Sequence, residues 1–326
     1  MCVLVVGGAG YIGSHVCKVL KESGWVPVVF DNLSTGHKWG AQFGSLVIAD
    51  VEDEGALFEA FASYQPEAVI YLASLINVRD SILDPELYYR HNMLGAITLL
   101  SAMRKAGVSR LIFSSTAAVY GTPMYLPIDE KHPKSPLNAY GKSKWAIEAM
   151  LEDFAHAYGL SFVAFRYFNA CGADPSGMIG EEHEPETHLI PLAIQTALGE
   201  RPFLPIYGND YSTPDGTAIR DYVHVLDLAL AHLQALDYLR QERSSVQLNL
   251  GSGCGYSVRQ IVDAVSAVAG KPIPTQILPR LPQDSPVLVA DVSYAQSVLN
   301  WTPGYTLPEI VATAYRWHAE RALVKL

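Results

Sequence analysis

The chain has 326 residues, 49% of them hydrophobic and 17% charged, which is typical of a globular protein with ample apolar area to bury. Its 33 acidic and 23 basic side chains give a net charge of −10, which disfavours general nucleic-acid binding because phosphate affinity needs a positive surface. There is no apolar run of about 18 residues and no basic leader, so we expect a cytoplasmic protein, neither secreted nor membrane-embedded. The cysteines at positions 2, 17, 171 and 254 form no CxxC pair and fit reduced thiols.

The first half of the chain alternates short apolar runs with helical stretches. Uninterrupted β-rich runs separated by helices predict a parallel sheet that is covered on both faces. We therefore expect a doubly wound α/β domain of the Rossmann type over residues 1–169, which binds NAD. The predicted strands are 3–6, 26–31, 45–50, 68–73, 110–115 and 161–168, and the predicted long helices are 86–106 and 138–158.

After residue 169 the sequence becomes rich in glycine, proline and charged residues. We expect a smaller mixed α/β domain over 170–326 that binds the substrate, with some chain crossing back to the first domain. Trp301 and Trp317 are expected to fill its core. The predicted elements are helices at 189–199, 226–240, 257–269 and 307–322, a strand at 246–251, and loops at 169–188 and 208–217.

Three glycines, Gly7, Gly10 and Gly13, lie between the first predicted strand and the next helix in the spacing GxxGxxG. Such a turn lets the backbone approach a pyrophosphate and aims the helix amino terminus at it. Asp31, at the end of the second strand, is placed to accept hydrogen bonds from an adenosine ribose, and its charge would repel a 2′-phosphate. We therefore predict NAD rather than NADP, with Lys38 as the one nearby cation that opposes this preference. A structural turn with a capping aspartate is the alternative interpretation.

Tyr140 and Lys144 form a YxxxK pattern, about one helical turn apart. Tyrosine is a poor base at neutral pH, but positive charge from a lysine and from oxidised nicotinamide would lower its pKa. Tyr140 is thus the predicted base for a substrate alcohol, with Lys144 tuning it and bonding the nicotinamide ribose. Thr116, or alternatively Ser115, supplies a hydroxyl at the end of the fifth strand that would position the same substrate alcohol. If the YxxxK pattern stood by itself, a packed tyrosine beside a surface lysine would explain it. That interpretation does not explain why the pattern occurs together with the glycine turn.

Together with the stretches FSSTAAVYG and SPLNAYGKSK, these motifs resemble the extended short-chain dehydrogenase/reductase family. Within it the chain most resembles the UDP-glucose (UDP-galactose) 4-epimerases, because RYFNACGADPSG, IYGNDYSTPDGTAIRDYVHVLDLA and LNLGSGCGYSV also match. The resemblance implies tightly held NAD, a UDP-hexose substrate, epimerisation through a transient 4-keto sugar, and a homodimer formed by the two long helices.

The resemblance also implies which residues bind. The implied cofactor residues are Gly7, Gly10, Tyr11, Ile12, Gly13, Asp31, Asn32, Asp50, Val51, Leu72, Ala73, Ser114, Tyr140, Lys144 and Tyr167. The implied substrate residues are Thr116, Tyr140, Asn169, His188, Leu189, Tyr207, Arg220, Tyr222 and Asp284, with Arg220 as the diphosphate clamp.

Some positions depart from the family's pattern. Ile76 stands where some members carry a lysine that bonds the NAD phosphates. Leu281 and Gln283 replace a basic residue and a glycine, which leaves Arg280 to touch the diphosphate in that run. Leu288 falls at a position that helps set the size of the sugar pocket, so the acceptance of N-acetylated sugars stays open.

Other functions are weighed against the same residues. A 4,6-dehydratase needs a carboxyl acid and base beside the strand-end threonine, where this chain has Ala117 and Ala118. A UDP-N-acetylhexosamine or UDP-glucuronate 4-epimerase and a non-catalytic NAD-binding regulator stay open as alternatives. His183 and His188 lack the HxxxH or HExxH spacing of a helical metal site, so we expect no bound metal.

Overall fold

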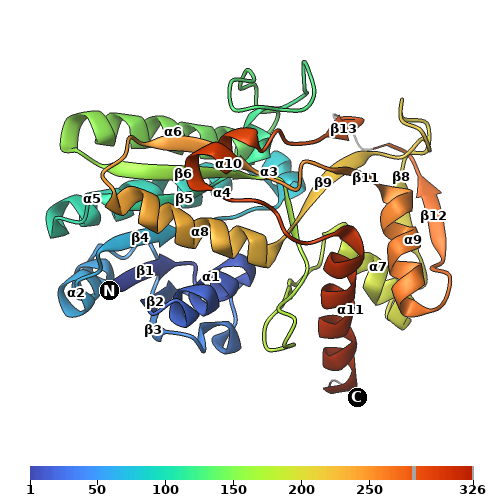
Figure 1. Cartoon of the computed structure of the whole chain (residues 1–326), viewed down its shortest axis with the longest axis horizontal. Coiled ribbons are helices and arrows are strands. Elements are labelled where there is room, and N and C mark those ends of the chain that lie inside the picture. The colour runs from blue at the N-terminus through green and yellow to red at the C-terminus, as the bar shows by residue number, and fades with distance from the viewer. Residues whose placement is uncertain (281–283, 325–326) are drawn as a thin grey trace.

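The computed structural model describes residues 1–280 and 284–324, so the departures at Leu281 and Gln283 lie outside the described residues. Seven parallel strands form the larger sheet of this described part, in the order β10-β6-β5-β4-β1-β2-β3 (Figure 1). The prediction of a doubly wound α/β fold is confirmed. The strands are β1 (Cys2–Val6), β2 (Val26–Asp31), β3 (Ser45–Ile48), β4 (Ala68–Tyr71), β5 (Arg110–Thr116), β6 (Ser161–Tyr167) and β10 (Val246–Leu250).

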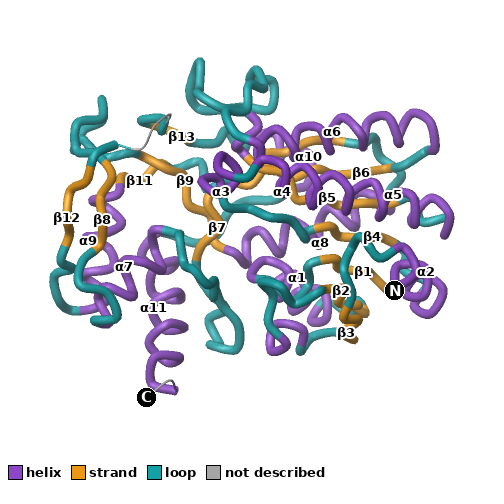
Figure 2. Tube along the Cα trace, turned by 180° about the vertical axis from the view of Figure 1, so that it is seen from behind, coloured by secondary structure: helices purple, strands orange, loops and turns teal. Residues whose placement is uncertain are grey.

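The sheet is buried on both faces because its strands carry apolar side chains at consecutive positions. In β1, Val3 and Val5 belong to one core and Leu4 and Val6 to the other, since successive side chains point to opposite faces. The first core is covered by α1 (Tyr11–Glu22) and α8 (Val225–Arg240), and the second by α2 (Glu54–Tyr64), α5 (Gly95–Ala106) and α6 (Ala139–Tyr158). Figure 1 shows α1 and α8 in front of the sheet, and Figure 2 shows α2, α5 and α6 on the opposite side.

The predicted helix over 86–106 is made of three consecutive segments. These are α4 (Pro85–Tyr89), a π-helical segment η2 (Arg90–Leu94) and α5. A short helix that was not predicted, α3 (Val78–Leu83), precedes them. A π-helical turn adds a residue to the helix and often marks a functional position; here it carries the buried Asn92.

The smaller half gathers three helices around a separate core, on the right of Figure 1. They are α7 (Leu189–Leu198), α9 (Val258–Ala269) and α11 (Leu307–Val324). A small sheet lies between the two halves: β9 (Ile219–His224) pairs with β7 (Asn169–Cys171), β11 (Gly255–Ser257) and β13 (Val287–Leu288). A two-stranded sheet joins β8 (Leu204–Tyr207) to β12 (Thr275–Leu278), and α10 (Ser293–Leu299) follows β13.

The chain returns to the larger half after residue 169, since α8 packs beside α1 and β10 pairs with β6. The division into a cofactor domain over 1–169 and a substrate domain over 170–326 therefore stays a prediction. The prediction for Trp301 is wrong, because this side chain lies in the core under α1 and α8 and its Nε1 donates to the Asp227 carbonyl at 2.8 Å. Trp317 lies with its ring 5.2 Å from that of Trp39, in contact with the first half. No helix in the described ranges has the length and apolarity to cross a bilayer.

Candidate active site

A pocket of about 400 Å³ opens where the larger sheet's strands end at their carboxyl termini. This is the edge at which ligands bind in doubly wound folds. The pocket extends to the segment that precedes α7. The predicted residues that line it are Gly7, Gly10, Tyr11, Ile12, Gly13, Asp31, Asn32, Asp50, Val51, Leu72, Ala73, Ser114, Thr116, Tyr140, Tyr167, Asn169 and His188.

The glycine turn between β1 and α1 has two roles. Gly7 has φ +84°, and a Cβ there would lie 2.5 Å from the Ala73 nitrogen, while a Cβ at Gly13 would lie 2.1 Å from the Gly7 oxygen. Packing within the protein thus requires the first and third glycines. A Cβ at Gly10 would meet only the Gly7 oxygen at 3.5 Å, on a residue that lines the pocket.

The amino terminus of α1 is free to bind an anion from the pocket. Gly10 is its N-cap, and no side chain caps the helix. The first backbone N–H groups of a helix lack partners within the helix and favour phosphate. Room at Gly10 and uncapped amides at the same turn fit a pyrophosphate.

Asp31 is buried at the end of β2 and holds the glycine turn. Its carboxylate accepts hydrogen bonds from the backbone nitrogens of Ala9 at 2.9 Å and Leu33 at 2.8 Å. Burial raises the pKa of Asp31, and these two bonds oppose that shift. Each carboxylate oxygen can accept more than one bond, so the capping role and a ribose contact are compatible. Lys38 is exposed and does not line the pocket, and no lysine or arginine is found among the described residues that do.

Asn32 and Asp50 lie on neighbouring loops at the same edge. The Asn32 amide donates to Asp50 Oδ2 at 2.8 Å, and the Glu52 nitrogen donates to Asp50 Oδ1 at 2.9 Å. Asp50 therefore stabilises these loops, and it also lines the pocket where an adenosine was predicted.

Tyr140 lies in the first turn of α6, which begins at a defined residue because Asn138 Oδ1 accepts a hydrogen bond from the Gly141 nitrogen at 2.8 Å. Burial raises the pKa of Tyr140, and its hydrogen bond with Thr116 lowers it. The sequence suggested that positive charge lowers the pKa of Tyr140, but no charged side chain of the protein alone has this effect. In that prediction part of the charge comes from the bound dinucleotide.

Lys144 is not a surface lysine, because only 2% of it is exposed. Its Nζ donates to the Ser114 carbonyl at 2.7 Å and lies 4.9 Å from the ring centroid of Phe113. Burial lowers the pKa of Lys144 to about 7, against an opposing effect from Glu148. Lys144 lies behind the wall of the pocket formed by Ser114.

A buried polar network, which was not predicted from the sequence, lies next to the helix that carries Tyr140 and Lys144. Arg166 donates from Nε to Glu148 Oε1 at 3.0 Å and from one terminal nitrogen to Oε2 at 2.6 Å. Its other terminal nitrogen donates to the Tyr120 hydroxyl at 3.0 Å, and that hydroxyl donates to Asn249 at 2.6 Å. These residues lie on α6, β6, the end of η3 (Ala117–Val119) and β10, so the network ties the helix of Tyr140 to the sheet.

Asn92 was also missed, since nothing in the sequence marks the π-helical segment. It accepts a hydrogen bond from the Leu75 nitrogen at 2.9 Å and donates to the Leu75 oxygen at 3.2 Å and to Ser143 Oγ at 3.1 Å. Asn92 thus joins the loop after β4 to α6 at the pocket wall. Tyr167, a predicted cofactor residue in that wall, makes a 2.7 Å hydrogen bond between its hydroxyl and His232.

The remaining predicted substrate residues do not line this pocket and lie beyond it, in the smaller half. Arg220 pairs with Asp284 and also donates to the Ile219 carbonyl at 2.8 Å, and the Tyr211 hydroxyl donates to Asp284 at 3.1 Å. Asn169 lines the pocket and also contacts the strand that carries Arg220, since its amide donates to the Asp221 carbonyl at 2.8 Å. Tyr222 is the register partner of Asn169, Tyr207 ends β8 with Arg79 over its ring, and Leu189 opens α7.

The match to a protein-family model decides the family. The model described as the NAD dependent epimerase/dehydratase family matches residues 3–251, which include the glycine turn, Asp31, Thr116, Tyr140 and Lys144. The chain belongs to the NAD dependent epimerase/dehydratase family.

Curated members of this family resemble the chain along nearly its whole length. The UDP-glucose 4-epimerase of Rhizobium meliloti (strain 1021) is 48% identical over 319 residues, which are 98% of this chain and 97% of the relative. The UDP-glucose 4-epimerase of Halalkalibacterium halodurans is 45% identical over 321 residues, or 98% of this chain and 96% of the relative.

Solved structures of the family superimpose closely. The UDP-glucose 4-epimerase from Brucella ovis in complex with NAD has a TM-score of 0.95 and 47% identity, and the match covers 96% of this chain and 97% of that one. The enzyme from Bifidobacterium longum in complex with NAD⁺ and UDP has a TM-score of 0.94 and 36% identity, covering 99% of both chains.

The family's description includes epimerases and dehydratases, and the residues after Thr116 separate the two. Ala117 and Ala118 follow it in η3 and are half-buried, so no acidic side chain stands at the two positions where a dehydratase needs its acid and base. The site therefore lacks this pair of carboxyl groups for the elimination of water.

A second group of titratable side chains lines the far wall of the pocket. Glu181, His183 and His188 contribute to the lining, and Glu186 lies beside them. Burial lowers the pKa of each histidine, but the two carboxylates outweigh this effect and raise the pKa of His183 to about 9 and that of His188 to about 10. Sequence reasoning treated the two histidines by themselves and missed the alternation of acid and histidine in EEHEPETH.

Proposed function

We propose that this chain interconverts UDP-glucose and UDP-galactose by NAD-dependent epimerisation at C4, through a transient 4-keto sugar. The observation that carries the proposal is that Tyr140 and Thr116 line the same pocket as the glycine turn. The names of the full-length relatives agree with it, as does the absence of acidic residues at positions 117 and 118.

The residues present fit NAD along the whole pocket. The uncapped amino terminus of α1 and the space at Gly10 would hold the pyrophosphate, and Asp31 the adenosine ribose. Lys144, behind Ser114, is the proposed partner of the nicotinamide ribose. When bound, NAD supplies the acceptor for hydride from C4 of the sugar and returns that hydride to the other face.

The protein's own part of the reaction is to orient the sugar and move one proton. Thr116 would hold the 4-hydroxyl, and the Tyr140 oxygen would take its proton as the C4–H bond is broken. The same oxygen returns the proton when the keto group is reduced after the sugar has turned in the pocket. Because burial alone raises the pKa of Tyr140, the base acts in the complex, where the cofactor's positive charge favours the phenolate.

The nucleotide part of the substrate is assigned to the residues of the smaller half around Arg220 and Asp284. Arg220 presents a guanidinium fork that matches phosphate oxygens, and its present partner is the carboxylate of Asp284. We propose that the diphosphate takes a place on Arg220 and that Asp284 turns to the ribose or hexose. Asn169, which lines the pocket and contacts the strand that carries Arg220, would place the sugar near Tyr140.

The homodimer and the cytoplasmic location stay part of this proposal. The two long helices expose large apolar side chains, as an interface between two copies requires. Reduced cysteines agree with the cytoplasm. The exposed side chains are Leu87, Leu94, Ile97 and Trp145.

Product analysis tests the proposed function. Purified protein is incubated with UDP-galactose, and the sugar is followed by NMR until equilibrium with UDP-glucose is reached. A second sample with the N-acetylated analogue measures the breadth of the sugar pocket, where Leu288 of β13 packs against Val119, Tyr120 and Ile128. A keto-deoxy product would indicate a dehydratase, and no change in the sugar would indicate a non-catalytic protein; either result would refute the proposal.

A further inference from the structure

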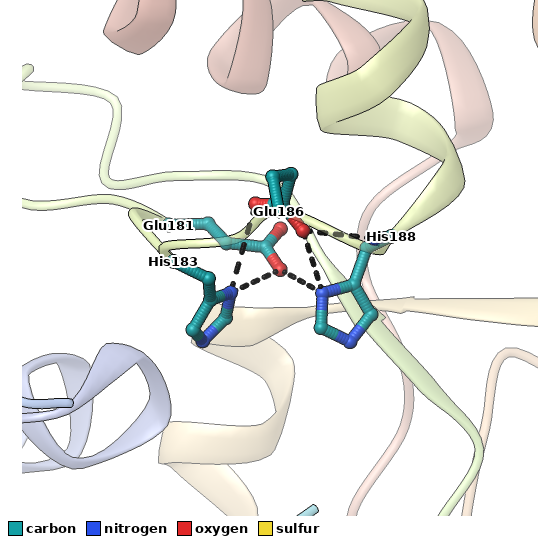
Figure 3. A group of neighbouring side chains, drawn as sticks. All are labelled: Glu181, His183, Glu186 and His188. Carbon is teal, nitrogen blue, oxygen red and sulfur yellow. Dashed lines mark hydrogen bonds and ion pairs between the residues drawn. The ribbon is translucent and has the colours of Figure 1, made fainter. Parts of the chain in front are cut away.

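Three side chains in the wall of the pocket and Glu186 beside them turn their nitrogen and oxygen atoms toward one another (Figure 3). Glu181, His183, Glu186 and His188 all belong to the segment between β7 and α7, and one ligand atom from each lies within 4.8 Å of the others. Figure 3 shows both imidazole rings with a nitrogen facing the two carboxylates. The spacing argued against a helical metal site, but a loop brings these residues together instead.

The distances in this group approach those of a tetrahedral site. Zinc binds nitrogen and oxygen at about 2.0–2.1 Å, so two ligand atoms of a tetrahedron lie about 3.3 Å apart. His183 Nδ1 lies 3.3 Å from Glu181 Oε1 and 3.6 Å from Glu186 Oε2. His188 Nδ1 lies 2.9 Å from Glu181 Oε1 and 3.0 Å from Glu186 Oε1. Because His183 faces Glu186 Oε2 and His188 faces Glu186 Oε1, a site with one oxygen from Glu186 has three edges close to the required length.

The charges of the group also suit a dication. The side chains of Glu181 and Glu186 are each only 4% exposed, and two buried carboxylates need two compensating positive charges. No lysine or arginine lines the pocket within the described residues. In the unbound protein the two protonated histidines supply those charges, and one dication with two neutral imidazoles would supply the same number. The buried Nδ1 of His183 makes no aligned hydrogen bond, although two carboxylates lie within 4 Å of it.

Hydrogen bonds from backbone amides and from one tryptophan side chain hold the ligand residues in place. Glu186 Oε1 accepts bonds from the backbone nitrogens of Thr187 at 2.7 Å and His188 at 2.8 Å. The Glu181 carbonyl accepts a bond from Trp317 Nε1 of α11 at 2.9 Å, and His188 is the N-cap residue of α7. Such supporting contacts orient metal ligands before the ion arrives.

We propose that Glu181, His183, Glu186 and His188 bind one divalent transition-metal ion of the zinc class. Two imidazole nitrogens with two carboxylates suit zinc, whereas calcium and magnesium prefer oxygen ligands alone. The ion ties the segment before α7 into a fixed loop and thereby shapes the wall of the pocket. It is a structural ion, and the proposal is independent of which sugar the protein converts.

Metal binding to the full-length, tag-free protein tests the site. The protein is stripped with a chelator, dialysed, and titrated with zinc by calorimetry, and the bound metal is counted by mass spectrometry. We expect one zinc per chain, no competition from magnesium, and binding weakened at least about tenfold in His183→Gln. Glu184→Gln is the matched control, because Glu184 is exposed in the same loop and is not one of the four. It should bind zinc as the unmodified protein does.

Two further measurements on the unmodified protein keep the test independent of how the variant folds. Cobalt in place of zinc should give the intense visible absorption of a tetrahedral site, and crystals grown with zinc should show an anomalous peak among these four side chains. Absence of binding, zinc bound equally by His183→Gln, or a peak elsewhere would each overturn the proposal. The four groups would then form ion pairs only.

Discussion

The Nζ of Lys144 donates a hydrogen bond to the carbonyl oxygen of Ser114 at 2.7 Å, which fixes the ammonium of α6 against the end of β5. Burial of this ammonium lowers the pKa of Lys144 from 10.5 to about 7. Between these values the unfolded chain binds one more proton than the folded chain at this residue. The contribution of Lys144 to the free energy of unfolding therefore rises with pH across that interval.

Replacing Lys144 by methionine should remove this pH dependence. A single proton corresponds to about 1.4 kcal/mol per pH unit. Urea unfolding at pH 7, 8 and 9 should show that stability increases less with pH in Lys144→Met than in the unmodified protein. Lys142→Met, on the exposed side of the same helix, serves as the control and should keep the original slope. Equal slopes in all three proteins would mean that Lys144 keeps an ordinary pKa.

Tyr140→Phe should abolish most of the epimerase activity while NAD stays bound, because only the proton acceptor is lost. General base groups contribute about 10² to 10⁴ in rate. The rate is measured with UDP-galactose in a coupled assay, and retained NAD is measured after denaturation. Tyr158→Phe, at the exposed end of α6, is the matched control and should react normally. Unchanged turnover in Tyr140→Phe would remove this residue from the mechanism.

Thr116 offers a test of the hydroxyl alone. Thr116→Ser keeps the hydroxyl and should retain most of the activity, whereas Thr116→Val keeps the shape and loses the hydroxyl that is proposed to hold the substrate alcohol beside Tyr140. A hydrogen bond to a group that becomes charged contributes about 1.5–3 kcal/mol, so kcat should fall about 10- to 100-fold in the valine variant. If serine and valine were equally active, Thr116 would only fill space.

Asp31→Ala should weaken NAD binding and reduce the preference for NAD over NADP, because the negative charge that repels a 2′-phosphate is lost. Part of the weakening will come from the glycine turn, since Asp31 also holds the Ala9 and Leu33 nitrogens. The ratio of the two affinities, measured by calorimetry, separates the effects because turn damage affects both cofactors. Lys38→Ala should leave the ratio unchanged, since this side chain lies outside the pocket. Equal affinities in the unmodified protein would contradict the ribose assignment.

Features that depend on neighbouring residues in the chain were predictable from the sequence. The strands and the glycine turn follow from apolar runs and glycine spacing, and the structure places Asp31, Thr116 and Tyr140 around one pocket as a result. Tyr140 and Lys144 were correctly placed on one helix, but the depth at which Lys144 is buried was not foreseeable, because it depends on β5 and Phe113.

Features that depend on distant pairing were missed. Some return of the chain to the first domain was expected, but not that the chain after residue 240 adds β10 to the larger sheet and carries Trp301 into a core other than the one predicted. The π-helical turn at Asn92 has no sequence signal, since its hydrogen bonds reach Leu75 and Ser143 on other elements. The four residues around Glu181 converge through the path of a loop, which periodicity does not describe.

The proposed dimer places the exposed apolar side chains of α4, η2, α5 and α6 between two copies. Ile97 on α5 is 39% exposed, and a glutamate there would place a charge in the interface without disturbing the core of the monomer. Ile97→Glu should therefore elute as a monomer in size exclusion with light scattering, while the unmodified protein elutes as a dimer. Leu230→Glu, at a similarly exposed position on α8 across the sheet, should remain dimeric. A monomeric unmodified protein, or a dimer broken only by Leu230→Glu, would place the contact elsewhere.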